Sequence, residues 1–313
     1  MSDLSIIIVS WNTRELLSAC LTAVIASVDG LVLEVFVVDN HSSDGSPEMV
    51  RDSFPQVRLI ENPDNVGFAA ANNQVFPFCS AEAILLLNSD TIVRPGALRT
   101  LFDFLREHPK AAAVGPKLVH PRVQLRILGA GRQPTLRTVI NHYLFLSALF
   151  PRIKFFEGVF LFVGQHDDRA RRVEWLSGAC LLVRKDAIKE VGPLSESFFM
   201  YCEDMEWCDR MLASGWELYH VSDAVVEHHL SASTEKNEQA SLLPITTARQ
   251  YFILRNKPGV WSLFNFDLAL VLGLTIRAGI YFGLSLVRPG SRPMWKARGR
   301  QFLRYASAAL QRS

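Results

Sequence analysis

The chain has 313 residues, of which 49% are hydrophobic and 20% are charged. This composition excludes a disordered chain and an ordinary multi-span membrane protein, and the length suffices for one domain with an appendage. The net charge of only +2 gives no reason to expect a nucleic-acid partner. Five scattered cysteines without a CxxC pair argue against a disulfide framework or a zinc site, and predict small buried side chains in a reducing compartment.

The first half of the chain alternates strand and helix patterns. Short apolar runs predict buried strands at residues 6–9, 35–38, 57–60 and 84–87, and a fifth at 111–114. The four residues before Leu16 are typical of a capping box that starts a helix. This βαβα order predicts an α/β fold with a mostly parallel central sheet and helices on both faces.

Polar residues follow three of the predicted strands, where each strand ends. In parallel α/β sheets, ligands bind beyond the carboxyl ends of the strands. A single polar strand end usually means only a turn, but three in one sheet favour a binding site. No GxGxxG, GxxxxGK[ST] or GxSxG motif occurs, which disfavours a nicotinamide dehydrogenase, a P-loop enzyme and an α/β-hydrolase. The polar ends are Ser10-Trp11-Asn12, Asp39-Asn40 and Asn88-Ser89-Asp90.

Residues 120–172 are less regular, and a second ordered block begins at 173. The apolar stretch 139–163 suits a core insertion, a membrane-facing loop or a lid over a binding site. The second block predicts a strand at 175–183, a helix at 203–213 and a strand at 217–226. The apolar run near the N-terminus is too short for a signal peptide and lacks a basic flank, so we expect the catalytic part to be cytoplasmic.

The C-terminal part is apolar and then basic. Residues 267–287 are rich in Leu and Ile but carry Arg277 at their centre, which is costly for a membrane span. Seven basic residues and no acid follow from Arg288 onward. We expect a helical segment that lies at the membrane interface or packs as a hairpin, held on an anionic membrane surface by the basic tail. A marginal span and an ordinary buried helix pair are the alternatives.

Three features of the chain suit metal and acid–base chemistry. Asp90 ends a buried strand, where a carboxylate can hold a divalent cation. Glu203 and Asp204 follow four large apolar residues, and burial there would raise the pKa of at least one carboxyl group, as suits a general base. A helix N-terminus enriched in acids explains this pair equally well. His228 follows a strand and is a possible metal ligand.

At this point the chain resembles the family-2 inverting glycosyltransferases, which have the GT-A fold, and among them the rhamnosyltransferase-like members. The order and spacing of the motifs carry the resemblance over about residues 4–235. The motifs are residues 5–12, Val37-Val38-Asp39-Asn40, 42–45, 61–69, Leu87-Asn88-Ser89-Asp90, Trp175-Leu176-Ser177-Gly178-Ala179, 198–204, and His228 five residues before Ser233.

The resemblance implies a role for each matching residue. Asp204 matches the general base with Glu203 beside it, and Asp90 and His228 match the metal ligands. Asn88 stands in place of the first metal-motif acid, and Leu230-Ser231 replaces the usual glycine, which keeps His229 as an alternative to His228. Residues implied to bind the nucleotide-sugar are Ser10, Asn12, Asp39, Asn65, Gly67, Asn88, Ser89, Asp90, Trp175 and Gly178.

The function expected from the resemblance is transfer of a sugar with inversion, helped by Mg²⁺ or Mn²⁺. The expected donor is dTDP-L-rhamnose, and the expected acceptor is a polyprenyl-linked or cell-surface glycan. A UDP-sugar-dependent transferase and a non-catalytic scaffold of polysaccharide assembly are the alternatives. The expected domains are a catalytic domain at 1–235, with halves at about 1–120 and 173–235, and a helical membrane-associated segment at 236–313. The expected location is the cytoplasmic face of the cell membrane, with peripheral or monotopic attachment.

Overall fold

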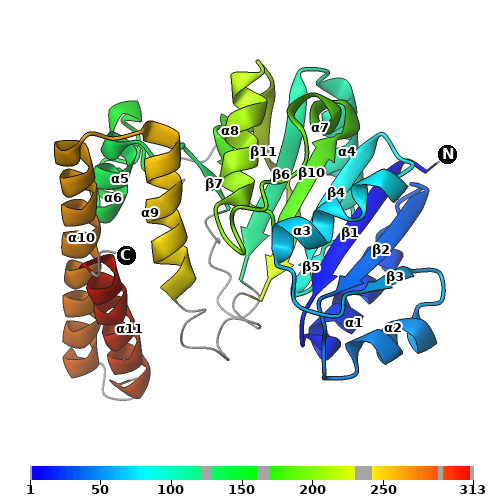
Figure 1. Ribbon diagram of the computed structural model, residues 1–313, viewed down its shortest axis with the longest axis horizontal. Helices are drawn as coiled ribbons and strands as arrows, with labels where there is room; N and C mark the ends of the chain where they lie inside the picture. The colour runs from blue at the N-terminus through cyan, green and yellow to red at the C-terminus, as the bar shows by residue number, and fades with distance from the viewer. Residues whose placement is uncertain (1, 121–128, 161–169, 230–241, 288–291, 311–313) are drawn as a thin grey trace. The chain divides into compact units, whose positions relative to one another are not determined.

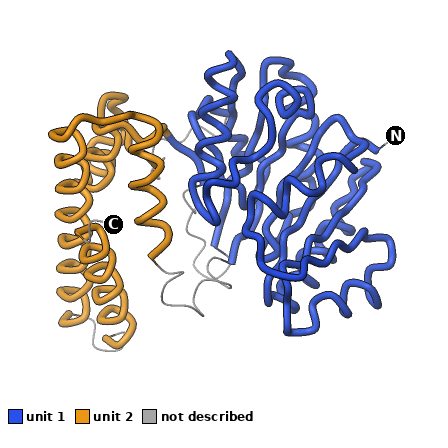
Figure 2. The backbone as a smooth tube through the Cα atoms, viewed as in Figure 1, with its two compact units in different colours: residues 1–131, 166–236 blue, residues 132–165, 237–313 orange. Residues whose placement is uncertain are grey.

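The computed structural model describes residues 2–120, 129–160, 170–229, 242–287 and 292–310. These residues form two compact units (Figure 2). Residues 1–131 and 166–236 make the first, here called the sheet unit, and residues 132–165 and 237–313 make the second, called the helical unit.

The sheet unit is built on a nine-stranded mixed sheet (Figure 1). Strands β3, β2, β1 and β4 are parallel neighbours, as predicted, whereas β10 runs antiparallel to β4 and β6, and β11 pairs parallel with β6 but antiparallel with β5 and β8. The sheet is therefore less parallel than expected, because its second half brings in antiparallel strands. The strands are β1 (Leu4–Ser10), β2 (Leu33–Asp39), β3 (Arg58–Glu61), β4 (Ala83–Asn88), β5 (Thr91–Val93), β6 (Ala111–Val119), β8 (Arg171–Val173), β10 (Cys180–Arg184) and β11 (Glu217–His228).

The central strands are buried on both faces, which explains their continuous apolar sequences. Ile6, Ile7 and Ile8 of β1 are fully buried, and so are Leu85 and Leu86 of β4. All five cysteines are buried and free, as predicted. A separate pair of short strands, β7 (Ala130–Gly131) and β9 (Trp175–Leu176), is antiparallel.

Helices cover the sheet, and the first of them begins where the sequence predicts. The predicted capping box is wrong, because the Thr13 side chain makes no capping hydrogen bond. The backbone N–H of Arg14 instead donates to Asp44 at 2.8 Å. The helices of this unit are α1 (Arg14–Ala26), α2 (Ser46–Ser53), α3 (Phe68–Asn73), η1 (Phe76–Phe78), α4 (Ala97–Glu107), α7 (Lys185–Val191) and α8 (Glu203–Ala213).

The helical unit combines part of the irregular middle of the chain with the C-terminal helices. Tyr251 donates a buried hydrogen bond of 2.8 Å to Gln133, and Phe252 stacks on Phe266 with ring centroids 4.2 Å apart. The described part of the stretch 139–163 belongs to this unit, and helix α5, which overlaps its start, packs on α10. Residues 161–163 lie outside the described residues. The helices are α5 (Leu136–Tyr143), α6 (Leu146–Leu149), η2 (Lys154–Phe156), α9 (Leu243–Asn256), α10 (Val260–Val287) and α11 (Arg292–Leu310).

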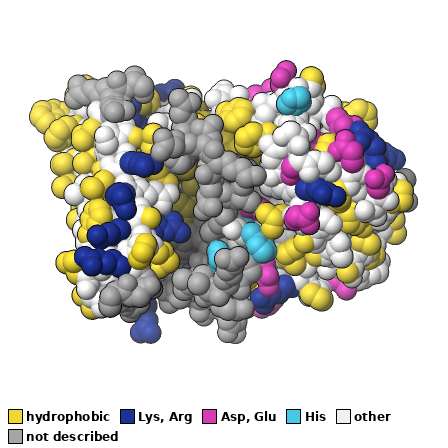
Figure 3. All heavy atoms as spheres, turned by 90° about the horizontal axis from the view of Figure 1, so that it is seen from below, with side chains coloured by type: hydrophobic (Ala, Val, Ile, Leu, Met, Phe, Trp, Pro, Cys, Tyr) yellow, Lys and Arg dark blue, Asp and Glu magenta, His cyan; other side chains and the backbone are white. Residues whose placement is uncertain are grey.

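Helix α10 is long and apolar enough to cross a membrane by length and composition alone. Its surface carries many exposed apolar side chains, and Lys and Arg side chains gather on the same unit (Figure 3). Only 28% of the most apolar 18-residue part of α10 is buried within the structure, whereas the core helix of a soluble domain is mostly buried.

Candidate active site

The polar ends of the central strands lie at one edge of the sheet. Ser10 pairs in register with Asp39, and the preceding residue of β1 pairs with Asn88 of β4. On the far side of the sheet, His228 at the end of β11 pairs with Thr91, the residue after Asp90. Residues that are far apart in sequence, from Ser10 to His228, therefore lie at strand ends of one sheet, where ligands bind in α/β folds.

Asp39 is a buried carboxylate with one oxygen still available. Its Oδ1 accepts a 2.7 Å hydrogen bond from the backbone N–H of Ser42. Its Oδ2 is buried and has no partner among the described residues. Burial raises the pKa of the Asp39 carboxyl above its ordinary value, although the Ser42 hydrogen bonds oppose this shift. An unpaired buried acceptor is costly, so the atom suits an N–H donor of a ligand such as a nucleobase.

Ser10 and Ser89 join a chain of hydroxyl groups between strand ends. The Thr13 hydroxyl lies 3.1 Å from that of Ser10 and 2.9 Å from that of Ser89. All three residues are buried. Ser10 and Ser89 thus connect β1 to the end of β4, and Thr13, which the sequence analysis did not single out as a site residue, is the link between them.

Asn12 organises the turn beside the strand ends. It adopts a left-handed conformation with φ of 53°. Its backbone N–H donates to the Ser42 hydroxyl at 2.8 Å, and its Oδ1 accepts the backbone N–H of Ser43 at 2.8 Å. Asn12 therefore fixes the loop that also supplies the hydrogen bond to Asp39.

Asn65 and Gly67 lie in a loop that is tied to the end of β2 by Asn40. The Asn40 amide donates to Asn65 Oδ1 at 3.2 Å and to the carbonyl of Gly67 at 3.3 Å. Gly67 has φ of +85°, and a Cβ atom there would meet the carbonyl oxygen of Phe199 at 2.6 Å. Only glycine fits this position, because both the conformation and the close approach exclude a side chain. Asn40 was seen in the sequence only as part of a polar strand end.

Asp90 and His228 form a close pair. Asp90 Oδ1 lies 3.1 Å from His228 Nε2, and each side chain is about one-tenth exposed, at 11% and 10%. The Nδ1 atom of His228 is buried without a partner among the described residues. His229 uses its backbone N–H to bind the Asp90 carbonyl at 2.9 Å, so it is His228 whose ring meets the carboxylate.

Asp204 is held at the start of α8 by backbone groups. The N–H of Gly178 donates to its Oδ2 at 2.9 Å, and the N–H of Met205 donates to its Oδ1 at 2.8 Å. A Cβ at Gly178 would lie 3.1 Å from the ring of Phe68 and 3.7 Å from Cβ of Asp204, so the lack of a side chain lets these groups pack closely. Gly178 therefore positions the Asp204 carboxylate through its own N–H group.

Glu203 is the more deeply buried acid of the pair. It is 5% exposed, and its Oε2 has no partner among the described residues. Burial raises the pKa of the Glu203 carboxyl well above its ordinary value, and the neighbouring Asp204 charge adds to the rise. Burial also raises the pKa of Asp204, against the hydrogen bonds from Gly178 and Met205. The expected upward shift for this pair is confirmed in direction.

Asn88 and Trp175 occupy different surroundings. The Asn88 N–H donates to the Ala179 carbonyl at 3.0 Å, which ties the end of β4 to the turn that carries Gly178. Trp175 lies in β9, opposite Gly131, and is 3% exposed. A contact of Trp175 with a bound sugar stays a prediction.

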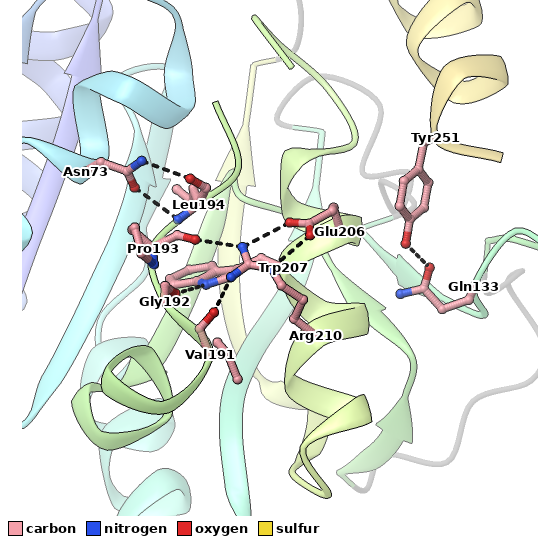
Figure 4. A network of polar contacts seen from close by, with 10 residues as sticks. All are labelled: Asn73, Gln133, Val191, Gly192, Pro193, Leu194, Glu206, Trp207, Arg210 and Tyr251. Atoms are coloured by element: carbon pink, nitrogen blue, oxygen red, sulfur yellow. Dashed lines mark hydrogen bonds and ion pairs between the residues drawn. The ribbon is translucent and has the colours of Figure 1, made fainter. Parts of the chain in front are cut away.

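A network around Arg210 fixes the segment that leads into the acid pair (Figure 4). Arg210 donates to Glu206 at 2.8 and 3.0 Å and to the carbonyls of Val191 and of Pro193. Asn73 of α3 forms two hydrogen bonds with the backbone of Leu194, at 2.9 and 3.0 Å. The sequence analysis missed these residues, because a loop held by its own carbonyl groups leaves no side-chain motif.

The Arg210 network and the Gly67 contact hold the same segment from two sides. Besides meeting Gly67, the Phe199 carbonyl accepts the Phe68 N–H at 3.2 Å. Residues 191–204 therefore connect the Asn65 loop to the acid pair through fixed backbone contacts. Chemically, the sheet unit offers a buried acceptor at Asp39, a carboxylate–imidazole pair at Asp90 and His228, and two acids with raised pKa values.

Comparison with known proteins identifies the family. The sequence profile described as glycosyl transferase family 2 matches residues 5–191, more than half of the chain. The chain is 29% identical over 279 residues to an N-acetylglucosaminyl-diphospho-decaprenol L-rhamnosyltransferase of Mycobacterium tuberculosis, covering 86% of this chain and 89% of that protein. It is 23% identical over 214 residues to the low-salt glycan biosynthesis hexosyltransferase Agl10 of Haloferax volcanii, covering 67% of this chain and 62% of that one.

Solved structures show the same fold. The mannosyltransferase PcManGT from Pyrobaculum calidifontis, in complex with GDP-Man and Mn²⁺, superposes with a TM-score of 0.60 at 16% identity, covering 99% of this chain and 89% of that chain. GalNAc-T7 with UDP, GalNAc and Mn²⁺ gives a TM-score of 0.60 at 12% identity, covering 85% and 54%. The chain therefore belongs to glycosyl transferase family 2, and it has the GT-A fold.

Proposed function

We propose that this glycosyltransferase moves L-rhamnose from dTDP-L-rhamnose to a lipid-linked glycan acceptor, with inversion at the anomeric carbon. The observation that carries the catalytic part is the placement of Asp204, whose carboxylate is oriented by the Gly178 N–H at 2.9 Å beside the buried Glu203. The choice of rhamnose is supported by the M. tuberculosis relative, whose named reaction uses that sugar and a decaprenol-linked acceptor.

In the proposed reaction, Asp204 accepts the proton of the acceptor hydroxyl as that oxygen attacks the anomeric carbon. The bond from the sugar to the nucleotide diphosphate breaks on the opposite side, so the anomeric configuration inverts. Backbone N–H groups from Gly178 and Met205 fix the acid, and burial raises the pKa of the neighbouring Glu203 carboxyl, which favours its neutral form. No enzyme nucleophile takes part.

Asp90 and His228 are the residues that would hold a divalent cation, Mg²⁺ or Mn²⁺. No group of three or more His, Cys, Asp or Glu side chains that could hold a metal ion occurs among the described residues, within which Asp90 and His228 are the two candidate ligands. Two protein ligands fit such an ion, which usually takes its remaining ligands from substrate phosphates and water. When bound, the ion neutralises charge on the departing diphosphate. The two solved structures of this fold that contain Mn²⁺ support a divalent metal in the proposed reaction.

Asp39, Asn65 and Gly67 would form the nucleotide pocket in this proposal. The unpaired Oδ2 of Asp39 suits the imide N–H of thymine or uracil. We further propose that the enzyme works on an anionic membrane surface at the cytoplasmic face; the apolar helix α10 and the decaprenol-linked acceptor in the name of the M. tuberculosis relative support this proposal.

The proposal is tested by thermal stabilisation of the purified protein with a panel of nucleotide diphosphates, with and without Mn²⁺. Metal-dependent stabilisation by dTDP and by dTDP-rhamnose is the expected result. A shift with UDP alone would replace the rhamnose donor with a UDP-sugar while retaining the reaction. No shift with any nucleotide would reject the enzyme assignment and favour a scaffold of polysaccharide assembly.

A further inference from the structure

One face of α10 carries a row of exposed apolar side chains. They recur every three or four residues, so they share one side of the helix. The two charged side chains of α10, Asp267 and Arg277, are only partly exposed, and Asp267 forms an ion pair with Arg249. Soluble monomers rarely expose a long contiguous apolar patch, so this face needs an apolar partner. The residues of this row, called the apolar stripe, are Trp261, Phe264, Leu268, Leu272, Ile276 and Ile280, each between 42% and 79% exposed.

The opposite face of α10 is fixed to α5 at its midpoint. Gly273 lies so close to the carbonyl of Tyr143 that a side chain would not fit. Arg277 donates to the carbonyls of Tyr143 and His142 at 2.9 and 3.1 Å, and its guanidinium lies 4.2 Å from the ring centroid of Phe145. The central arginine of this apolar helix therefore binds the C-terminal end of a neighbouring helix.

Helix α11 lies along α10 and carries the positive charge. Tyr281 stacks on Trp295 and on Phe302, with ring centroids 5.6 and 5.4 Å apart, and Gly299 packs against the Phe282 ring. A row of Lys and Arg side chains lies among apolar ones on this unit (Figure 3). Helix α11 contains no acid, and its basic residues are Arg292, Lys296, Arg298, Arg300 and Arg304.

These contacts are incompatible with a membrane-spanning α10. A span would place the end of α5, with its Arg277-bound carbonyls, at the centre of the hydrocarbon layer, together with the basic side chains of α11. An orientation parallel to the membrane surface avoids both costs. It lets the apolar stripe enter the acyl boundary while the basic side chains stay among the headgroups.

We infer that the α10–α11 hairpin is a monotopic anchor that lies in the plane of the membrane, with the apolar stripe inserted and the basic residues of α11 bound to anionic lipid headgroups. The inference rests on the proposed function and states how the protein would bind the membrane. It does not depend on the identity of the donor sugar.

Topology is tested by single cysteines at the two ends of α10. Val260 is 85% exposed and Val287 is 78% exposed, whereas all five native cysteines are buried. The variants Val260→Cys and Val287→Cys are expressed as the full chain and treated with a membrane-impermeant maleimide, in intact spheroplasts and in inside-out vesicles. The expected result is that both cysteines react from the same side. Reaction from opposite sides would overturn the inference.

The lipid contact is tested by sedimentation with vesicles of phosphatidylethanolamine containing phosphatidylglycerol. The double substitution Leu272→Ser/Ile276→Ser should lower the bound fraction at least tenfold, whereas Val32→Ser/Phe78→Ser, at exposed positions of the sheet unit, should bind like the wild type. Arg298→Gln/Arg300→Gln should weaken binding roughly 30-fold on these vesicles and leave binding to neutral vesicles unchanged.

Wild-type vesicle binding by the stripe variant would contradict the inference. A circular dichroism spectrum equal to that of the wild type shows that each variant is folded. Activity on a short-chain, water-soluble acceptor separates the two proposals, because the stripe variant should keep that activity whether or not it binds vesicles. If the wild type does not turn over this acceptor, the proposed function is contradicted and the inference about the membrane anchor is not.

Discussion

Replacement of Asp204 by Asn tests the proposed base most directly, because it removes the proton acceptor while keeping the side-chain shape. Loss of a general base lowers the rate of the chemical step by about 10²–10⁴-fold. The structure adds a second effect. Both carboxylate oxygens accept backbone N–H groups, from Gly178 and Met205, and an amide has only one oxygen. One N–H then loses its acceptor, which costs about 1–3 kcal/mol of stability, while removal of the buried charge acts in the opposite direction because burial raises the pKa of Asp204.

The control for that second effect is Asp44→Asn in the same unit. Asp44 also accepts two backbone N–H groups, from Arg14 at 2.8 Å and Ser46 at 3.1 Å, and it has no proposed part in the chemistry. The assay is kcat at saturating donor and acceptor, with Tm measured for each variant. We expect a smaller loss of Tm in Asp44→Asn, because Asp44 is exposed and water can replace its lost hydrogen bond, and a loss of kcat only in Asp204→Asn. A kcat within tenfold of the wild type in Asp204→Asn, or an equal loss in Asp44→Asn, would refute the assignment.

Three further predictions follow from buried acids, a close backbone contact and the carboxylate–imidazole pair. Glu203→Gln should be more stable relative to the wild type at pH 7 than at pH 5, because burial raises the pKa of the folded Glu203 carboxyl and the unfolded carboxyl therefore loses its proton first as the pH rises above 4.5. Urea unfolding at pH 5 and 7 measures this difference in the free energy of unfolding, and equal differences at both pH values would contradict it. Gly67→Ala should lower Tm and weaken nucleotide binding, because the added Cβ would meet the Phe199 carbonyl at 2.6 Å. Gly96→Ala is the control: Gly96 has a similar φ but open space around it, so its Tm should fall less. Equal losses of Tm would show that only the backbone conformation matters. His228→Ala should raise the Mn²⁺ concentration needed for stabilisation by dTDP at least tenfold. Titration of Mn²⁺ at fixed dTDP measures this concentration, and an unchanged value would remove His228 from the proposed metal site.

The central strands and most helices could be predicted because each carries its own local pattern. The apolar runs at 6–9 and 84–87 form β1 and β4, and the helix predicted at 203–213 is α8 with the same bounds. The antiparallel direction of β10 could not be predicted, since its sequence is equally apolar on both faces and carries no sign of direction. The proposed capping box failed because the carboxylate of Asp44, 30 residues away, binds the N-terminus of α1 instead.

The site was predictable where a side chain has a role that few residue types can fill. The strand-end carboxylates of Asp39 and Asp90 and the acid pair before α8 are visible as motifs. The pairing of Asp90 with His228, at 3.1 Å, required knowledge of which strands are neighbours. Thr13 and Arg210 were missed, because their contribution is to join segments that are distant in sequence.

Backbone N–H groups help to hold both the acid of the proposed nucleotide pocket and the proposed base. Ser42 N–H binds Asp39, and Gly178 N–H binds Asp204. A backbone donor persists through most substitutions, so the N–H bond to Asp39 would survive a change of the Ser42 side chain, although the Ser42 hydroxyl also interacts with Asp39 and accepts the Asn12 N–H. Gly178 cannot change so freely, because a side chain there would press on Phe68 at 3.1 Å and move the N–H that orients the acid. The position of the proposed base therefore depends on the absence of a side chain at Gly178, and Gly178→Ala should lower kcat more than it weakens donor binding.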